Sequence, residues 1–333
     1  MGWSGDEGRD KGTRRHKVKK LGVGAAAMRR RALLIAGPTA SGKSAVALAI
    51  ARRLGATIID ADSMQVYRDL RVLTARPAES EERLVPHELF GCVDGAVNFS
   101  AGRWLVEAGE AADRAFARGA PAIFVGGTGL YFRALTDGLS EIPAVPDDVR
   151  ARVRAEAEPL PSETLHAELA ARDAASAAKL RPGDRQRILR ALEVLAATAR
   201  PIVSFHGARG APTLESGQWR GIFLTPDREA LNAAIERRFE AMLTAGALAE
   251  VAALVRRGLD PALPVMRAHG VPHLIAHLNG GLSLEEAARR SVLDTRRYAK
   301  RQFTWARHQM PDFAWVAPEE AVEAGARALD SFR

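Results

Sequence analysis

The chain has very little cysteine: Cys92 is the only one in 333 residues, so an internal disulfide and a zinc site of several thiolates are both excluded. It also lacks any apolar run near the roughly 18 residues that a membrane-spanning helix needs. Aromatic residues are few, at 6%, yet 47% of the residues are hydrophobic, enough for a sizeable core. These features predict a soluble, cytoplasmic protein with one large domain and a smaller appended unit.

The positive charge is unevenly distributed along the chain. Residues 1–27 hold seven Lys or Arg against three Asp or Glu, which is +4 of the formal net charge of +8. This basic leader lacks the apolar segment of a signal peptide, so we expect it to be disordered. Two interpretations stay open: an arm that binds nucleic acid, or an untranslated segment with the true start at Met28.

The strongest motif lies near the start of the chain. An apolar strand over 31–36 leads into Gly37-Pro38-Thr39-Ala40-Ser41-Gly42-Lys43-Ser44, a complete G-x-x-x-x-G-K-[ST] phosphate loop, and a helix is expected over 45–54. Glycines let backbone N–H groups converge on phosphate oxygens, the Lys adds a positive charge, and the final hydroxyl reaches Mg²⁺. The motif therefore predicts a diphosphate or triphosphate site, with Ser44 on Mg²⁺.

Two further strands end in residues that suit a ligand site. Residues 56–63 are a short β-branched run ending in carboxylates, and ligands bind at the carboxyl ends of parallel strands, so Asp62 is predicted to face the phosphates. The alternative for Asp62 is a helix N-cap. A strand over 120–125 ends in Gly126-Gly127-Thr128-Gly129 rather than in an acid, which argues against an ordinary ATPase. Three glycines around one hydroxyl favour a backbone close to a ligand that Thr128 contacts.

The rest of the sequence predicts an α/β fold: a P-loop-type parallel sheet flanked by helices, with an inserted small helical domain. Residues 138–201 shift to Ala, Arg and Glu with prolines between short helical patterns, and are predicted to be the insertion. Residues 28–137 and 202–333 then form the catalytic domain with C-terminal helices. The stretch 201–217, rich in Gly, Pro and Ser, is expected to be a mobile loop.

Two long helices are expected near the C-terminus. A strand over 221–224 precedes one helix over 226–257, whose Arg238 either reaches substrate phosphates or forms a surface ion pair. The last helix opens with a capping box at Ser283. Its basic residues alternate with aromatic ones, which fits attraction to RNA or amphipathic packing with solvated ends.

Five motifs in the same order make the chain resemble the tRNA dimethylallyltransferase (IPP transferase) family. They are Gly37–Ser44, Asp62–Arg68, Gly126–Tyr131, Gly183–Glu193 and Thr295–Trp305. The resemblance implies transfer of a five-carbon allylic group from dimethylallyl diphosphate to N6 of adenosine-37, the nucleoside just 3′ of the tRNA anticodon. It implies that Lys43 stabilises the leaving diphosphate with Mg²⁺, that Asp62 orients and deprotonates the amine, and that Thr128 bridges the reacting groups.

The resemblance also implies where the tRNA anticodon stem-loop is contacted. The implied contacts are Asp62, Ser63, Met64, Gln65, Thr128, Arg150, Gln186, Arg187, Ile188, Leu189 and Arg190. Without the resemblance, Arg187 and Arg190 are an ordinary solvated helix face. The insertion is expected to embrace the RNA, and a monomer is expected.

Two other classes of function stay open. A P-loop kinase of a nucleotide or small molecule would use the loop with ATP, although no adenine-binding lid is evident. A non-catalytic RNA-binding module would leave Lys43 and Asp62 without a purpose. The family often has paired histidines near His87 and Gly-Tyr at 270–271, and this chain departs from both, so no role is predicted for His87 or His269.

Overall fold

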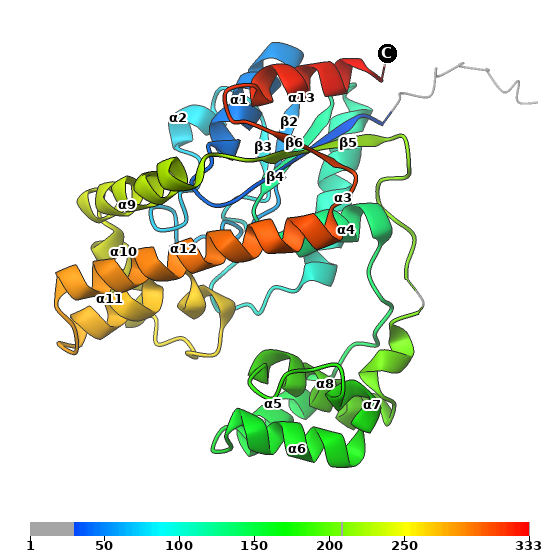
Figure 1. The fold of residues 1–333 in the computed structure, drawn as a ribbon, viewed down its shortest axis with the longest axis vertical. Coiled ribbons are helices and arrows are strands. Elements are labelled where there is room, and N and C mark those ends of the chain that lie inside the picture. The colour runs from blue at the N-terminus through cyan, green and yellow to red at the C-terminus, as the bar shows by residue number, and fades with distance from the viewer. Residues whose placement is uncertain (1–29, 208, 333) are drawn as a thin grey trace, which may run out of the picture.

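The computed structural model describes residues 30–207 and 209–332, so the predicted leader, residues 1–27, lies outside the described residues. Figure 1 shows a larger body built around a sheet and a smaller helical lobe joined to it by two chain segments. Among the helices of the described residues, none combines the length and the apolar character that crossing a bilayer requires.

Six parallel strands form the sheet, in the order β3-β2-β4-β1-β5-β6. Their bounds are β1 Ala32–Ala36, β2 Thr57–Asp60, β3 His87–Glu88, β4 Ala122–Gly126, β5 Trp219–Leu224 and β6 Phe313–Val316. Every residue of β1, β2 and β4 is buried, as expected for central strands of a parallel sheet. The predicted α/β fold class is confirmed, and the edge strands β3 and β6 are additions to the prediction.

Helices cover both faces of this sheet (Figure 1). One face carries α1 (Lys43–Leu54) and α13 (Ala321–Asp330), and the other carries α3 (Ala101–Ala117), α4 (Gly129–Asp137) and α12 (Leu284–Gln309). Successive side chains of a strand point to opposite faces. Leu33 and Ile35 therefore pack on the face covered by α1 and α13, and Leu34 packs on the face covered by α3, α4 and α12. The sheet is thus buried on both sides, and ligands can reach it only at its edges and strand ends.

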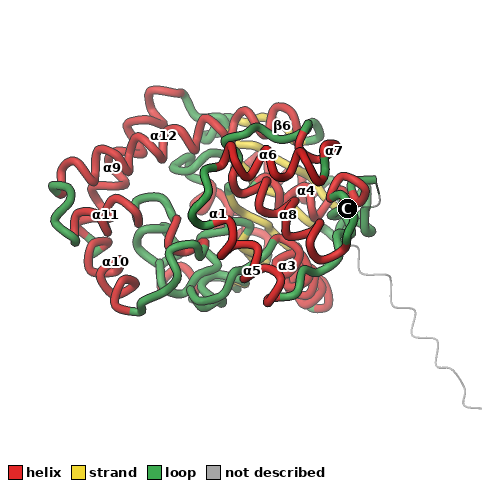
Figure 2. The backbone as a smooth tube through the Cα atoms, turned by 90° about the horizontal axis from the view of Figure 1, so that it is seen from below, coloured by secondary structure: helices red, strands yellow, loops and turns green. Residues whose placement is uncertain are grey.

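The single long helix predicted over 226–257 is two helices, α9 (Arg228–Thr244) and α10 (Ala247–Arg256). Gly246 separates them with φ +101°, a left-handed conformation that favours glycine and ends the first helix. The remaining short elements of the body are α2 Glu79–Glu82, the 3₁₀ turn Pro264–Arg267 and α11 Val271–Leu278. Figure 2, seen from below, shows α9, α10 and α11 together at one end, beside part of α12.

The helical lobe has an apolar core of its own. It contains α5 Asp147–Ala157, α6 Ser162–Arg172, α7 Ala174–Ala177, α8 Arg185–Thr198 and the 3₁₀ turn Ile202–Phe205. The two connecting segments run antiparallel, with a bridge between Ser140 and Arg209, and the Gly210 N–H donates to the Leu139 carbonyl at 2.9 Å. The lobe is therefore an insertion between α4 and β5, held on a paired stalk.

Candidate active site

The carboxyl ends of three neighbouring strands bring the predicted residues to one place. The phosphate loop follows β1, Asp62 lies two residues after β2, and Thr128 lies two residues after β4. Since β2, β4 and β1 are adjacent in the sheet, these three segments lie side by side. The structure therefore gathers Lys43, Asp62 and Thr128 where ligands bind in parallel α/β sheets.

The phosphate loop has the backbone shape of an anion site. Ala40 and Gly42 have φ of +64° and +86°, and such left-handed residues turn neighbouring N–H groups towards a common concave side. The Ser41 hydroxyl is buried and makes no hydrogen bond within the described part of the chain. The Lys43 ammonium crosses the loop and donates to the Pro38 carbonyl at 2.7 Å. Polar groups are thus concentrated at the N-terminus of α1, where anions are favoured.

Lys43 is held at an unusually low proton affinity. Burial lowers the pKa of its ammonium to about 8; the Asp62 carboxylate acts in the opposite direction, and the Arg238 charge lowers it further. The charged form therefore predominates below pH 8 and is lost above it. A bound diphosphate would stabilise the ammonium, so the low pKa belongs to the protein without that ligand.

Arg238, on α9, points to the same loop. Its guanidinium donates to the Thr39 hydroxyl, and burial lowers its pKa although Asp62 raises it. The surface ion pair, one of the two interpretations of this residue, is not found among the described residues. A second cation, 199 residues from Thr39 along the chain, thus lies beside the phosphate loop.

Asp62 is fixed by its own neighbours. One carboxylate oxygen, Oδ1, accepts from the Met64 N–H at 2.9 Å, and the Asp62 N–H donates to Asp60 Oδ1 at 2.9 Å. Residues 63–66 form turns, and the next helix along the chain begins only at Glu79, so the N-cap alternative is wrong. Burial, and then the Asp62 charge, raise the pKa of Asp60 well above its usual value. Asp60 therefore supports the Asp62 backbone from inside the protein.

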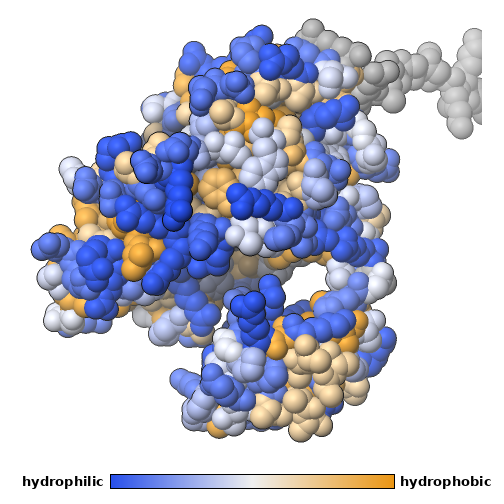
Figure 3. Space-filling model, viewed as in Figure 1, coloured by the Kyte–Doolittle hydropathy of each residue, from blue (hydrophilic) through white to orange (hydrophobic). Residues whose placement is uncertain are grey.

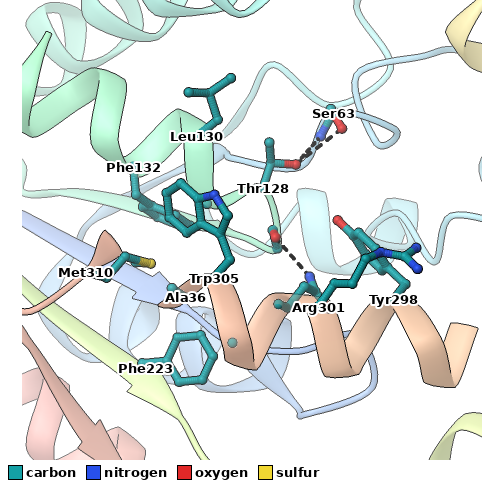
Figure 4. Close-up of a pocket in the computed structure, with 14 residues that line it drawn as sticks. Ala36, Ser63, Thr128, Leu130, Phe132, Phe223, Tyr298, Arg301, Trp305 and Met310 are labelled. Carbon is teal, nitrogen blue, oxygen red and sulfur yellow. Dashed lines mark hydrogen bonds between the residues drawn. The ribbon is translucent and has the colours of Figure 1, made fainter. Parts of the chain in front are cut away.

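Thr128 is tied to the segment that follows β2. Its Oγ1 accepts from the Ser63 N–H at 2.9 Å and donates to the Ser63 hydroxyl at 3.2 Å (Figure 4). The glycines around it serve protein contacts: a Cβ at Gly126 would collide with the Ala61 carbonyl, and one at Gly127 with the Gln302 amide. A Cβ at Gly129 would meet the Trp305 ring in the same way. These glycines thus have close protein neighbours, while Gly127, Thr128 and Gly129 also line a cavity, so the ligand contact expected of this backbone stays a prediction.

Three cavities adjoin these residues. The phosphate-loop cavity, about 310 Å³, is lined by residues 39–45 together with Asp62, Gln65, Thr74 and Arg238. The Asp62 cavity, about 200 Å³, shares Thr39, Asp62, Thr74 and Arg238 with it and adds Met64, Leu73, Phe239, Arg267 and His269. The aromatic cavity, about 180 Å³, is lined by Ser63, Thr128, Phe132, Phe223, Tyr298, Trp305 and Met310 (Figure 4). Ser63 and Tyr298 line both of the last two cavities.

Several lining residues come from α12, and no individual site role was predicted for them. Burial and the Asp62 charge raise the pKa of Tyr298, and its ring lies 4.6 Å from the His269 ring. Burial also lowers the pKa of His269, which favours the neutral imidazole. The motif Thr295–Trp305 of the family resemblance covers these α12 residues. It did not predict individual roles for them, because α-helical periodicity alone does not tell which residues of a helix face a cavity.

The predicted RNA contacts divide into two groups. Ser63 and Met64 line the cavities, while the Gln65 amide is used within the protein, donating to the carbonyls of Thr74 (2.8 Å) and Ala75 (3.1 Å). The other group lies in the helical lobe, at Arg150, Gln186, Arg187, Ile188, Leu189 and Arg190, and lines none of the three cavities.

Within the lobe, Ile188 is fully buried in the core, so its side chain is not a surface contact, and Leu189 packs against the same core. Two arginines pair with the buried carboxylate of Glu193. The half-buried Arg190 has its Nη1 3.8 Å from Glu193 Oε2, and Arg154 Nε lies 2.8 Å from Glu193 Oε1. Arg150 bonds Asp147 at 2.7 Å, and Gln186 and Arg187 are exposed. Figure 3 shows strongly hydrophilic side chains on the edge of the lobe that faces the main body.

Comparison with known proteins identifies the group of proteins to which this site belongs. The family model described as IPP transferase matches residues 65–309, and the one described as Isopentenyl transferase matches residues 30–85. A relative from Methylocella silvestris named tRNA dimethylallyltransferase is 63% identical over 87% of this chain and 96% of its own. One from Bradyrhizobium sp. (strain BTAi1), of the same name, is 59% identical over 87% and 95%.

Solved structures agree with this result. The tRNA isopentenylpyrophosphate transferase of Bacillus halodurans matches with a TM-score of 0.64 and 30% identity, covering 91% of this chain and 98% of that one. A eukaryotic dimethylallyltransferase, solved acting on tRNA, has the same fold, with a TM-score of 0.73 and 24% identity over 90% of this chain and 78% of its own. Since the family model covers most of the sequence and the relatives match nearly end to end, the chain belongs to the IPP transferase family.

Proposed function

We propose that this protein transfers the dimethylallyl group of dimethylallyl diphosphate to N6 of adenosine-37 in tRNA, giving N6-dimethylallyladenosine and diphosphate. One observation carries the proposal: Lys43, Arg238 and the phosphate loop converge on a cavity whose wall also contains the Asp62 carboxylate. Cations and loop N–H groups suit a leaving diphosphate, and a carboxylate suits an attacking amine. Relatives named tRNA dimethylallyltransferase support the same activity.

The chemistry divides between these groups. The bond between C1 of the allyl group and the diphosphate oxygen breaks, and its electrons leave with the diphosphate, which Lys43, Arg238 and the loop stabilise. The N6 lone pair forms the new bond to C1. The proton that N6 then loses passes to Asp62, which the Met64 N–H and Asp60 hold in place.

The two organic parts of the substrates fit the two other cavities. N6 must lie within hydrogen-bond reach of Asp62, so we place the adenine in the Asp62 cavity, with Arg267 and His269 among its polar walls. The dimethylallyl chain then extends towards the aromatic cavity, where the Trp305, Phe223 and Tyr298 rings offer an apolar surface. Aromatic faces also favour the positive charge that develops on an allylic carbon.

Mg²⁺ fits the phosphate-loop cavity. The Ser44 hydroxyl and the Asp62 carboxylate both line it, and Mg²⁺ in phosphate sites takes one or two protein oxygens together with substrate phosphates. The ion would be held by Ser44 and would neutralise part of the diphosphate charge.

We place the tRNA anticodon stem-loop between the lobe and the main body. The arginines of α5 and α8 on the lobe would contact RNA phosphates, which position the substrate without specifying its sequence. A base drawn out of the loop would then reach Asp62. In line with a tRNA substrate, we propose a cytoplasmic monomer.

Replacing Arg190 by Ala is expected to weaken binding of an anticodon stem-loop about tenfold and to lower the slope of log affinity against log salt by about one. One lost phosphate contact has this effect on all RNA sequences alike. Fluorescence anisotropy over a salt series measures both quantities. Arg172→Ala is the control, because Arg172 lies on α6 and pairs with Glu168 at 2.8 Å. An unchanged salt slope in Arg190→Ala would remove Arg190 from the interface.

Replacing Arg238 by Met is expected to lower kcat/KM for dimethylallyl diphosphate about 10- to 100-fold, the usual effect of losing a hydrogen bond to a charged group. Steady-state kinetics at saturating RNA measure the loss. Arg237→Met is the matched control, since Arg237 is the exposed neighbour on the same helix. Equal kinetics in the two variants would show that Arg238 does not serve the diphosphate.

The function itself is tested by product analysis. The protein is incubated with Mg²⁺, dimethylallyl diphosphate and an anticodon stem-loop RNA, and the RNA is digested to nucleosides for mass spectrometry. N6-dimethylallyladenosine is the expected new nucleoside. Unmodified RNA together with ATP hydrolysis or phosphoryl transfer would favour a P-loop kinase instead.

A further inference from the structure

A buried glutamine connects the two loops that the proposed reaction must hold together. Gln302, on α12, is 8% exposed. Its Oε1 accepts from the Thr39 N–H of the phosphate loop at 2.9 Å, and its Nε2 donates to the Gly127 carbonyl at 2.9 Å. Gly127 and Gln302 both line the aromatic cavity, next to Thr128 and Trp305.

The amide oxygen and the amide nitrogen of Gln302 each form a hydrogen bond with a backbone group, so this one side chain joins the phosphate loop to the loop after β4. The Thr39 hydroxyl also accepts a hydrogen bond from the Arg238 guanidinium. Gly127 directly precedes Thr128, whose hydroxyl accepts a hydrogen bond from the Ser63 N–H. A Cβ at residue 127 would collide with Nε2, so only glycine permits this approach. The contacts form one chain from the diphosphate side of the site to the segment that carries Asp62.

We propose that Gln302 is a positioning residue that sets the distance between the phosphate loop and the Thr128–Ser63 pair, and so between the leaving diphosphate and the attacking amine. This inference rests on the proposed function. A glutamine suits the role because one planar amide supplies both an acceptor and a donor. Neither a carboxylate nor an ammonium group can replace both bonds.

The consequence for catalysis follows from how sharply transfer depends on geometry. A displacement of about 1 Å can lower a rate about 10²-fold. When the amine is misplaced, water can take its position at C1. The C1–O bond to diphosphate still breaks, a water oxygen bonds to C1, its proton goes to solvent, and the products are dimethylallyl alcohol and diphosphate.

The test measures two products in parallel for Gln302→Met, a side chain of similar size without the amide. Diphosphate release is followed by a coupled assay and transfer by label on an anticodon stem-loop RNA. We expect the transfer rate to fall about 10²-fold, and the ratio of diphosphate released to groups transferred to rise above one. Affinity for dimethylallyl diphosphate, measured by calorimetry, should change by less than about threefold, because the backbone N–H groups and the lysine of the phosphate loop still bind the diphosphate.

Two further variants separate positioning from stability. Gln309→Met removes the other glutamine at the end of α12, which bonds Arg133 away from both loops, and should keep the wild-type rate and ratio. Gln302→Glu keeps an acceptor for the Thr39 N–H but sets a carboxylate oxygen against the Gly127 carbonyl, and should also raise the ratio.

A merely structural role would lower both product rates in proportion to the folded fraction and leave the ratio at the wild-type value. That result, or wild-type transfer by folded Gln302→Met, would overturn the inference. Failure of the proposed function is distinct, because the wild-type protein would then transfer no label to RNA.

Discussion

Replacing Asp62 by Asn is expected to lower the rate of dimethylallyl transfer about 10³-fold, within the range for losing a general base. Asparagine keeps Oδ1 as an acceptor for the Met64 N–H, so the turn at 62–64 is preserved and only proton acceptance is lost. Single-turnover transfer to an anticodon stem-loop, with both substrates saturating, measures the effect on the chemical step.

The matched control for that variant is Asp113→Asn, since Asp113 lies on α3 and pairs with Arg30 at 2.9 Å on the surface. It should transfer at the wild-type rate. RNA binding by Asp62→Asn should stay within about threefold of wild type, because we place most of the phosphate contacts on the lobe. A transfer rate near that of wild type would assign the base elsewhere and leave Asp62 a structural role.

Replacing Lys43 by Met is expected to lower kcat/KM for dimethylallyl diphosphate about 10²- to 10³-fold, as is typical when a preorganised group that stabilises developing charge is removed. The wild-type pH profile should contain the signature of this residue. Because burial lowers the pKa of Lys43 to about 8, raising the pH through 8 removes its charge, and kcat/KM should fall on that side.

The alkaline fall in kcat/KM should disappear in Lys43→Met, and in Lys43→Arg it should move beyond the accessible range, since a guanidinium stays charged. The profile of kcat should depend less on pH, because bound diphosphate stabilises the ammonium. An alkaline limb at the same pH in all three proteins would show that another group titrates there, and Lys43 would lose its assigned role.

Local sequence signals predicted the parts of the site that the backbone builds. The phosphate loop needs glycines and a lysine at fixed spacing, and the strands before Asp62 and Thr128 are short apolar runs typical of buried parallel strands. The carboxyl ends of parallel strands lie at the same edge of a sheet, so the loops that follow these three strands were expected at that edge. Local signals also predicted the fold class, because strands that alternate with helices along the chain favour a parallel sheet.

Contacts between distant segments could not be predicted in this way. Gln302 meets Thr39 across 263 residues, and Arg238 meets it across 199, so neither pairing has a local pattern. The approach of Gln302 to Gly127 and of Trp305 to Gly129 has no local pattern either, because a sequence does not say which distant side chain packs against a glycine.

Gly246 lies inside the predicted helix over 226–257, and its positive φ divides that helix into α9 and α10. In α8 the buried positions 188, 191 and 192 lie on one helix face, so the Ile188 side chain packs in the core of the lobe, and the RNA contact that the resemblance implies for the segment 186–190 stays a prediction.

The most direct test of the central proposal is transfer of labelled dimethylallyl, from its diphosphate and with Mg²⁺, to two anticodon stem-loops that differ in one atom group. One has adenosine at position 37, and the other has purine riboside there, which lacks the N6 amine. We predict label on the first RNA only, in a mole-for-mole ratio with the diphosphate released. Label on both RNAs, or on neither, would contradict N6 of adenosine-37 as the acceptor.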